Sequence, residues 1–510
     1  MSSAVRTAPP LLASLSGVLL FLSFPTLGHP AVAWLALVPL LIAVAPVTPW
    51  RALRLGAVTG LVHFAGTLYW IPAVMIEYGG LPVPAAWFVH ALLVAVLALF
   101  PALFAAGTAD LTARMGPPGL LFAPALWVTT ELGRMHLFTG FPWALVGYSQ
   151  VPFPAVAQAA SVVGVLGVSG LVVAVNGAIA YAVVAGSGSR RTPVVATAAL
   201  VAVVVAFGAW RLEDRSLLRA GSALRVAALQ GNFRQDEKWN PLRSDAILET
   251  YLGQTRRAAA GGARLVVWPE SATPFPLDRD SRGEAVRAGA RESGAHLLVG
   301  TTEVVRDAGT RYYNAAYMIE PDQGATSGVY RKQHLVPFGE YVPLRWALFF
   351  ISPLVDAVAD FSPGTEPRTL PVGGSSVGTA ICYEIIYPGL VRELVLRGSE
   401  LLATVTNDAW YGRSAAPYQH FQQATMRAIE QGRFLVRAAN TGISGVIDPY
   451  GRVLARSELF EPAVVVEDVR LLDGLTFYGR FGDAPAYAGV VIAAIAIGCG
   501  RRRRLRDWRP

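Results

Sequence analysis

The hydrophobic pattern divides the chain into long apolar segments and one polar region. A helix needs about 20 apolar residues to cross a bilayer, and apolar runs near that length begin the chain, at 11–27, 31–46, 53–76, 85–108, 118–134, 154–186 and 192–211. Another run, 484–498, lies close to the C-terminus. The pattern predicts a multi-span α-helical membrane domain over 1–212, with about seven transmembrane helices. It also predicts a C-terminal transmembrane helix and a basic tail over 481–510.

The region 213–480 alternates charged residues, Gly and Pro turns and short β-rich runs. Eight such runs predict strands, at 224–230, 264–268, 296–302, 314–320, 376–381, 401–406, 433–440 and 445–447. Between strands, 243–260 and 419–431 have helical patterns. This alternation is typical of a layered α/β domain, and roughly 270 residues are enough to bury a core.

Composition agrees with this division, because 53% of the 510 residues are hydrophobic and 15% are charged, against about 25% charged in soluble domains. The net charge is +8, but the densest basic run, 501–506, directly follows an apolar segment and is typical of a cytoplasmic helix end. We therefore expect no nucleic-acid partner. Two cysteines argue against a disulfide-built scaffold, and no metal-ligand spacing occurs, so neither a metal nor a cofactor is expected.

Arginines between the apolar runs predict the orientation. In a seven-span arrangement these arginines all fall on one side of the membrane, at Arg6, Arg51, Arg54, Arg114, Arg190 and Arg191. Basic loops remain in the cytoplasm. The domain 213–480 is therefore expected on the outer face of the membrane.

Two features allow two interpretations each. Glu131, Arg134 and His136 end the fifth apolar run, either as functional groups at membrane depth or as an interfacial anchor with a local ion pair. The apolar run 346–351 is too short to span a bilayer. It is either a loop that enters the lipid interface or a buried core helix.

Cys382 directly follows the predicted strand 376–381, with Glu384 two residues on and Pro388 ending the turn. A thiol at a strand end can face a cleft, although a buried and inert thiol is the alternative. The other cysteine, Cys499, lies in an apolar run and is expected to be inert.

A carboxylate and an ammonium are candidates to accompany that thiol. Glu270 follows the predicted strand 264–268, where a layered sheet usually has its cleft, although an exposed loop carboxylate is the alternative. Lys332 and Lys238 are the only two lysines among 43 basic residues. A compact ammonium differs from a guanidinium, so Lys332 is a candidate, whereas Lys238 is interpreted as a surface residue.

These three side chains together make a nucleophilic site. The thiolate is the reactive form of cysteine, so a carboxylate base and a nearby ammonium would activate the thiol. The ammonium can then stabilise the oxyanion that forms when the thiolate attacks a carbonyl.

Three ordered motifs carry a resemblance to a known superfamily. Trp-Pro-Glu-Ser at 268–271, Tyr-Arg-Lys-Gln-His-Leu-Val-Pro-Phe-Gly-Glu at 330–340 and Ile-Cys-Tyr-Glu at 381–384 resemble the motifs of the nitrilase superfamily. The segments 406–410 and 437–442 are similar to further segments of it. With its membrane spans, the whole chain resembles the apolipoprotein N-acyltransferase family of the bacterial envelope.

That resemblance implies an αββα sandwich and an acyltransferase of the bacterial cytoplasmic (inner) membrane. The implied reaction moves a fatty acyl chain from a phospholipid, through a Cys thioester, to the N-terminal amine of a diacylglyceryl-cysteine lipoprotein. The implied partners are therefore phospholipid acyl donors, diacylglyceryl-modified apolipoproteins and membrane lipid.

The resemblance also implies residue roles. Glu270 is implied as general base, Lys332 as oxyanion partner and Cys382 as nucleophile. The supporting residues are implied to position the lysine, to shape the site or to contact substrate; they are Glu340, Tyr383 and Glu384, and Trp239 on the substrate side.

Two other functions remain open at this stage. Water could replace the acceptor amine, which would make the protein a membrane-tethered amidase or nitrilase, although a small soluble amide needs no membrane domain. Alternatively, a transporter or receptor could use a non-catalytic nitrilase-like domain to bind a ligand, but such a domain has no need of an intact Glu, Lys and Cys.

Overall fold

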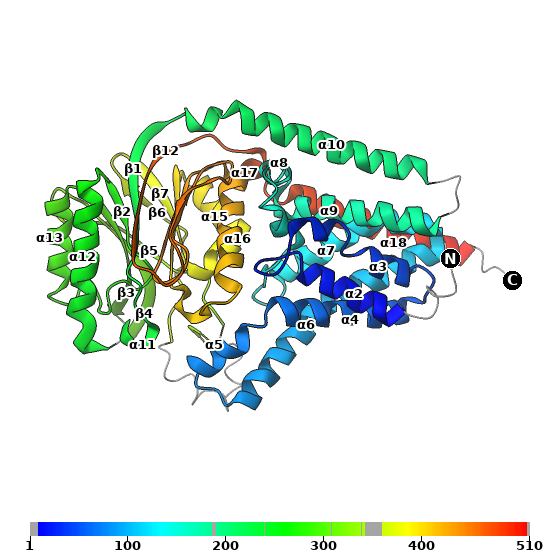
Figure 1. Cartoon of the computed structure of the whole chain (residues 1–510), viewed down its shortest axis with the longest axis horizontal. Helices are drawn as coiled ribbons and strands as arrows, with labels where there is room; N and C mark the ends of the chain where they lie inside the picture. Colours follow the sequence, from blue (N-terminus) through cyan, green and yellow to red (C-terminus); the bar gives the residue numbers. More distant parts are fainter. Residues whose placement is uncertain are drawn as a thin grey trace. The chain divides into compact units, whose positions relative to one another are not determined.

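The computed structural model describes residues 9–185, 190–238, 240–307, 309–337, 339–341 and 360–506. The chain forms two compact units (Figure 1). The helical unit comprises Met1–Pro72, Val83–Asp214 and Phe481–Pro510. The globular unit comprises Ala73–Pro82 and Arg215–Arg480.

The helical unit is built from apolar helices, which are α2 (Pro9–Phe21), α3 (Val38–Val44), α4 (Pro49–Thr67), α6 (Val83–Met115), α7 (Ala123–His136), α8 (Pro154–Ala157), α9 (Ala160–Val184), α10 (Arg191–Asp214) and α18 (Ala484–Arg506). Three helices among the described residues are long and apolar enough to cross a membrane: Val83–Met115, Ala160–Val184 and Arg191–Leu218. A fourth span results if α4 and α5 (Ile71–Glu77), which meet at a 51° bend, are taken together. The arrangement of about seven spans before the globular region stays a prediction.

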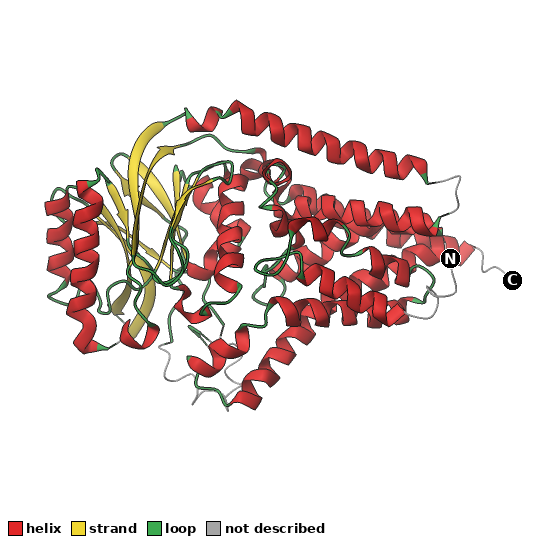
Figure 2. Ribbon diagram, in the orientation of Figure 1, coloured by secondary structure: helices red, strands yellow, loops and turns green. Residues whose placement is uncertain are grey.

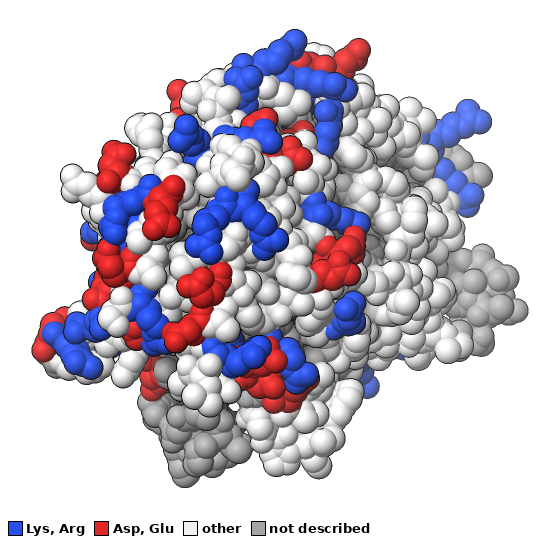
Figure 3. Space-filling model, turned by 60° about the vertical axis from the view of Figure 1, so that its left-hand side comes forward, with Lys and Arg blue, Asp and Glu red and all other residues white. Residues whose placement is uncertain are grey.

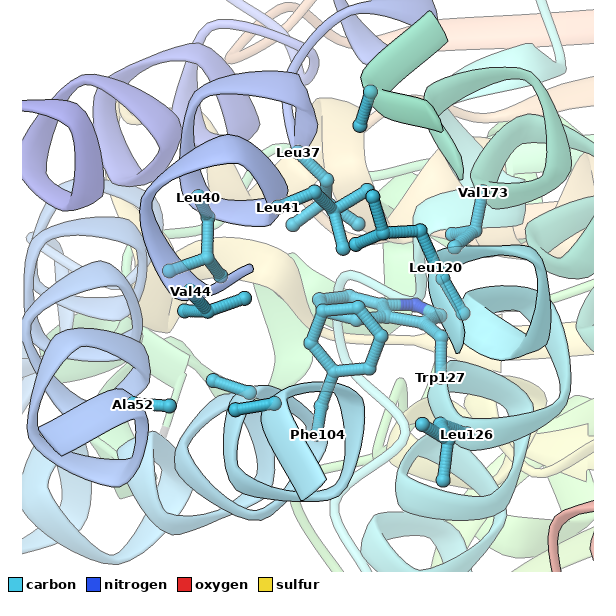
Figure 4. Close-up of a cluster of buried hydrophobic side chains, with 14 of the residues drawn as sticks. Leu37, Leu40, Leu41, Val44, Ala52, Phe104, Leu120, Leu126, Trp127 and Val173 are labelled. Atoms are coloured by element: carbon cyan, nitrogen blue, oxygen red, sulfur yellow. The ribbon is translucent and has the colours of Figure 1, made fainter. Parts of the chain in front are cut away.

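Small residues let two of these helices approach closely. A Cβ atom on Gly56 of α4 would lie 2.3 Å from the carbonyl oxygen of Pro101 in α6, and one on Gly60 would lie 2.6 Å from the Cα atom of Ala98. Glycine at these positions allows backbone contact, as is common between membrane helices. Larger side chains fill the adjacent core, where the ring edge of Phe104 meets Trp127 with centroids 4.9 Å apart (Figure 4).

The ionisable residues at the end of α7 have a structural role. Glu131 is buried and accepts a hydrogen bond from the Val146 amide at 2.8 Å. Arg134 is also buried and donates to the carbonyl oxygens of Phe141 and Trp143 at 3.0 and 2.5 Å. Both side chains therefore hold the loop that follows α7, whereas His136 is exposed.

The globular unit contains two six-stranded sheets, ordered β12-β1-β2-β3-β4-β5 and β11-β10-β9-β8-β7-β6. The strands are β1 (Ser222–Gln230), β2 (Leu265–Val267), β3 (His296–Arg306), β4 (Thr310–Ile319), β5 (Thr326–Arg331), β6 (Thr369–Val372), β7 (Ser375–Ile381), β8 (Leu401–Thr406), β9 (Leu435–Ala439), β10 (Gly445–Ile447), β11 (Val453–Arg456) and β12 (Ala463–Leu471). The main helices are α12 (Ser244–Ala260), α13 (Gly283–Ser293), α15 (Pro388–Leu396) and α16 (Ala416–Gln431).

Successive side chains of a strand point to opposite faces of its sheet, so one face packs on the other sheet and the opposite face packs on helices. In β1, Val226 and Ala228 enter the core between the sheets, while Ala227 and Leu229 pack on the opposite face with residues of α12 and α13. This is the two-residue period of a strand buried on both faces. Helices α15 and α16 lie against the second sheet (Figures 1 and 2). The layers confirm the predicted αββα sandwich.

The exposed surface of the globular unit carries both signs of charge. On the face in Figure 3, basic and acidic side chains are interspersed. Helix α13 shows the pattern at the level of single pairs, because Arg287 pairs with Asp278 and Arg291 with Glu284, each at 2.5 Å. Such mixing is typical of a solvent-facing surface.

Ala73–Pro82 joins the globular unit although it lies between two apolar helices in sequence. The hydroxyl of Tyr78 donates to the carbonyl oxygen of Ala409 at 3.2 Å, and its ring meets Trp410 edge-on with centroids 5.0 Å apart. The segment is therefore anchored beside the short helix Asp408–Tyr411, which follows β8.

Candidate active site

Cys382 occupies a sharp turn at the end of β7. Its φ angle is +53°, in the left-handed region that residues other than glycine rarely adopt. The residue also begins a short 3₁₀ helix, Cys382–Ile386, and is buried. A non-glycine residue held in this region is often part of a functional site, because the surrounding structure must stabilise it.

Glu270 lies three residues after β2, on a turn that approaches β3 closely. A Cβ atom on Gly300 of β3 would be 2.2 Å from the carbonyl oxygen of Pro269, so only glycine fits there. The Glu270 side chain is buried, and its Oε1 atom accepts a hydrogen bond from Asn314 Nδ2 at 2.7 Å. Asn314 also donates to Glu340 Oε1 at 2.8 Å, which holds the two carboxylates in fixed positions.

Lys332 follows β5 and lies between those carboxylates. Its Nζ atom is 2.9 Å from Glu340 Oε1 and 3.4 Å from Glu270 Oε1, and the residue is 1% exposed. Burial alone would lower the pKa of Lys332, but the charges of Glu340 and Glu270 raise it above its usual range. The ammonium therefore stays charged.

Burial and nearby charges determine whether the Cys382 thiol is protonated. Burial raises the pKa of Cys382 to about 12, and the Glu270 carboxylate acts in the same direction, while Lys332 opposes both. The resting thiol therefore keeps its proton and needs a base when it attacks. Thus the structure brings Glu270, Lys332 and Cys382, which the sequence singled out, into one buried cluster.

Glu384 links the cysteine turn to the lysine turn. Its Oε1 atom accepts hydrogen bonds from the Tyr330 hydroxyl at 2.9 Å and the Gln333 amide at 2.7 Å, while Oε2 accepts from the Ile381 amide at 2.7 Å. Burial raises its pKa to about 7, although these hydrogen bonds oppose the shift. Glu384 therefore connects the segments that carry Lys332 and Cys382.

Tyr383 belongs to an aromatic cluster next to the cysteine. Its ring centroid is 5.3 Å from that of Tyr387, which in turn lies 3.8 Å from the ring of His334. All three rings come from segments adjacent to Cys382 or Lys332. The role of Tyr383 in shaping the site stays a prediction.

The position of Lys238 differs from the one predicted from the sequence. Its interpretation as a surface residue is wrong, because it is 2% exposed and its Nζ atom donates to the backbone carbonyl oxygen of Glu270 at 2.7 Å. Lys238 ends the polar helix Gln-Asp-Glu-Lys. The rarity of lysine was a signal for it as much as for Lys332.

A second buried network, which the sequence did not reveal, supports the backbone of the cysteine turn. His420 Nε2 lies 3.1 Å from the carbonyl oxygen of Cys382, which can only accept, so this nitrogen carries the hydrogen. Burial and the charge of Arg437 lower the pKa of His420, so its ring is neutral. Its Nδ1 lies 3.1 Å from both Arg437 Nη2 and Asp408 Oδ1. Arg437 also donates to Asp408 at 2.7 Å. His420 thus supports the backbone of Cys382 rather than its thiol.

Trp239 and the run 346–351 lie outside the described residues, so both interpretations of 346–351 stay open. Within the described ranges, no group of three His, Cys, Asp or Glu side chains is placed to hold a metal ion. The cluster of Glu270, Lys332 and Cys382 supplies a carboxylate base, an ammonium and a thiol.

Known protein families match both parts of this chain. Residues 16–178 match the family model of the apolipoprotein N-acyltransferase N-terminal domain, and 225–473 match that of carbon-nitrogen hydrolases. The chain is 41% identical to an apolipoprotein N-acyltransferase of Geobacter metallireducens over 97% of this chain and 95% of the relative. It is 38% identical to one of Methylococcus capsulatus, over 97% and 96%.

Among solved structures, the nitrilase-superfamily protein Nit3 of Saccharomyces cerevisiae is 18% identical. It covers 49% of this chain and 93% of its own, with a TM-score of 0.39.

Proposed function

Because the chain belongs to the apolipoprotein N-acyltransferase family, we propose that its buried Glu270, Lys332 and Cys382 carry out the acyl transfer. The protein is an acyltransferase, and its substrates are in general lipoproteins and phospholipids. The observation that carries the residue assignment is the position of Lys332. Its ammonium lies between two carboxylates, and its charge lowers the pKa of the Cys382 thiol against the effect of burial. A binding protein has no need of this costly burial of charge.

In the first proposed step, a phospholipid ester acylates Cys382. Glu270 takes the thiol proton as the sulfur attacks the ester carbonyl, and Lys332 stabilises the oxyanion that forms. The ester C–O bond then breaks. The leaving lysophospholipid receives the proton from Glu270, and a thioester remains on Cys382.

The second proposed step transfers the acyl chain to the acceptor. The N-terminal amine of a diacylglyceryl-cysteine lipoprotein attacks the thioester, and Glu270 takes its proton. The C–S bond breaks as the amide forms, and the thiolate regains a proton from Glu270. A thioester lets two large lipid substrates use one cleft in turn. Hydrolysis as the main reaction is not favoured, because the relatives are N-acyltransferases along almost their whole length.

We also propose a domain arrangement for the membrane. Segment 1–212 and the helix within 481–510 are embedded in the bacterial cytoplasmic (inner) membrane, the basic tail lies in the cytoplasm, and 213–480 lies on the outer face. The arginine distribution supports this orientation, since basic loops stay in the cytoplasm.

Reporter fusions test that orientation. We expect alkaline phosphatase fused near Asn232 to be active and the same reporter fused at Arg191 to be inactive, because the enzyme folds only outside the cytoplasm. The reverse pattern would overturn the proposed topology.

The function itself is tested on the lipoproteins that cells make. Mass spectrometry of lipoprotein N-termini from cells with and without this protein should show the third acyl chain only when the protein is present. Lipoproteins that are fully acylated without it, in cells with no other such enzyme, would contradict the function.

A further inference from the structure

Lys238 is a buried cation that the reaction steps above do not use. It ends the short helix Gln235–Lys238 and is 2% exposed. It donates to the backbone carbonyl oxygen of Glu270, whereas Asn314 donates to the carboxylate. Burying an ammonium is costly unless partners stabilise it. Its partner here is the peptide that carries the proposed base.

That peptide belongs to a strained turn. Ser271, directly after Glu270, has a φ angle of +46°. The turn is bound to β3 on both sides, by Trp268 N to Leu298 O at 2.8 Å and by Ala272 N to Gly300 O at 2.7 Å. Between these two bonds, the Lys238 ammonium holds the Glu270 carbonyl oxygen at 2.7 Å. Lys238 thus fixes the one peptide of the turn that determines where the Glu270 side chain starts.

The charges of the site give Lys238 a second role. Glu270 and Glu340 are two buried carboxylates, and Lys332 supplies one positive charge between them. With Lys238 protonated, two ammonium groups balance these two carboxylates, and the buried Glu384, whose pKa is about 7, adds negative charge as it ionises. When the Cys382 thiol loses its proton to solvent, the thiolate adds one negative charge to the cluster. The Lys238 ammonium therefore favours the thiolate.

Burial and a neighbouring charge set the protonation of Lys238 itself. Burial lowers the pKa of Lys238 to about 8, while the Glu270 carboxylate opposes that shift. The ammonium is therefore charged below about pH 8 and loses its charge as the pH rises through that value.

We propose that Lys238 is a positioning residue for acyl transfer, which holds the turn bearing Glu270 and supplies a second positive charge that favours the Cys382 thiolate. This role deepens the function proposed above and rests on it. It does not require Lys238 to touch either substrate.

The test compares Lys238→Met, which removes the charge, with Lys238→Arg, which keeps it. Full-length proteins are purified in detergent in a Cys499→Ala background, because Cys499 is exposed and would also react. Iodoacetamide alkylation of Cys382 is measured from pH 6.5 to 9.5 by peptide mass. Acylation of Cys382 by phospholipid is measured in parallel.

We expect Lys238→Met to slow both reactions about 10- to 100-fold at pH 7, the effect of losing a charged hydrogen bond. The ratio of parent to Lys238→Met alkylation rates should then fall as the pH passes about 8, because the parent lysine also becomes neutral there. Lys238→Arg should show no such fall, since arginine keeps its charge.

Equal rates in Lys238→Met and the parent would overturn the proposal. A slower rate whose ratio to the parent is constant across the pH range would overturn it as well, because that result means packing without a charge effect. If Lys238→Met does not fold, the alkylation rates of the parent and Lys238→Arg are compared instead. The ratio of the parent rate to the Lys238→Arg rate should fall as the pH passes about 8, and a constant ratio would overturn the proposal. A parent that alkylates as expected but never becomes acylated would contradict the proposed function, whereas the alkylation ratios would still test the effect of Lys238 on the Cys382 thiolate.

Discussion

Cys382→Ala is expected to lower acyl transfer by at least about ten-thousand-fold, as is usual when a nucleophile that forms a covalent intermediate is removed. The sulfur is the atom that bonds to the acyl chain in the proposed reaction, so no other side chain of the cluster can replace it. The measurement is transfer from phospholipid to a fluorescent diacylglyceryl lipopeptide.

The matched control for this variant is Cys499→Ala. Cys499 is exposed and lies in the apolar helix α18, and its loss should leave transfer unchanged. Turnover in Cys382→Ala within tenfold of the parent would contradict the assignment of the nucleophile, and loss of activity in Cys499→Ala would point to the other thiol.

Lys332→Arg is expected to lose activity by about a hundredfold or more although the charge is kept. The Lys332 ammonium lies 2.9 Å from Glu340 and 3.4 Å from Glu270 at 1% exposure, so the site has no room for a planar guanidinium. An arginine would also pair with one carboxylate through two nitrogens, which would move the charge away from the oxyanion.

The neighbouring residue provides the control for that variant. Arg331 pairs with Glu303 at 2.5 Å, and 41% of its side chain is exposed. Arg331→Lys loses the two-nitrogen pairing with Glu303. That pair is separate from the contacts of Lys332 with Glu270 and Glu340, so activity should stay within a few-fold. If Lys332→Arg turned over like the parent, the compact ammonium would not be the oxyanion partner. Lys238→Arg cannot serve as a neutral control, because Lys238 is buried in the same cluster.

The sequence predicted the parts of the globular fold whose signals are local. Strand β2 is an apolar run and β7 a run of small and β-branched residues; Glu270 lies three residues after β2, and Cys382 directly follows β7. The family and its acyltransferase activity, which the three motifs indicated, are confirmed by the relatives. The roles of Glu270, Lys332 and Cys382 stay predictions.

Long-range pairing explains what the sequence missed. Strand β12 carries Glu467, Asp468 and Arg470, so its pattern is not that of a buried strand, yet it pairs with all of β1 from Ser222 to Gln230. Strands β5, β6 and β11 were missed as well. No local pattern shows such a partner more than two hundred residues away. The burial of Lys238 and of the network of His420, Arg437 and Asp408 has the same origin.

Backbone conformation is the other feature that sequence patterns did not reveal. Both Cys382 and Ser271 have positive φ angles, of +53° and +46°. Each lies in the turn that carries or follows a proposed reacting residue. The hydrogen bonds from His420 to Cys382 and from Lys238 to Glu270 hold these two turns. The site is thus supported by contacts from helices distant in sequence.

The central claim is that Cys382 forms a thioester with the acyl chain, and mass spectrometry of the purified protein tests it most directly. The protein is given phospholipid without an acceptor. We predict one acyl chain on the Cys382 peptide, released by neutral hydroxylamine and by an acceptor lipopeptide, absent in Cys382→Ala and formed much more slowly in Glu270→Gln. An adduct that persists in Cys382→Ala, or one that water removes as fast as the lipopeptide does, would contradict the account.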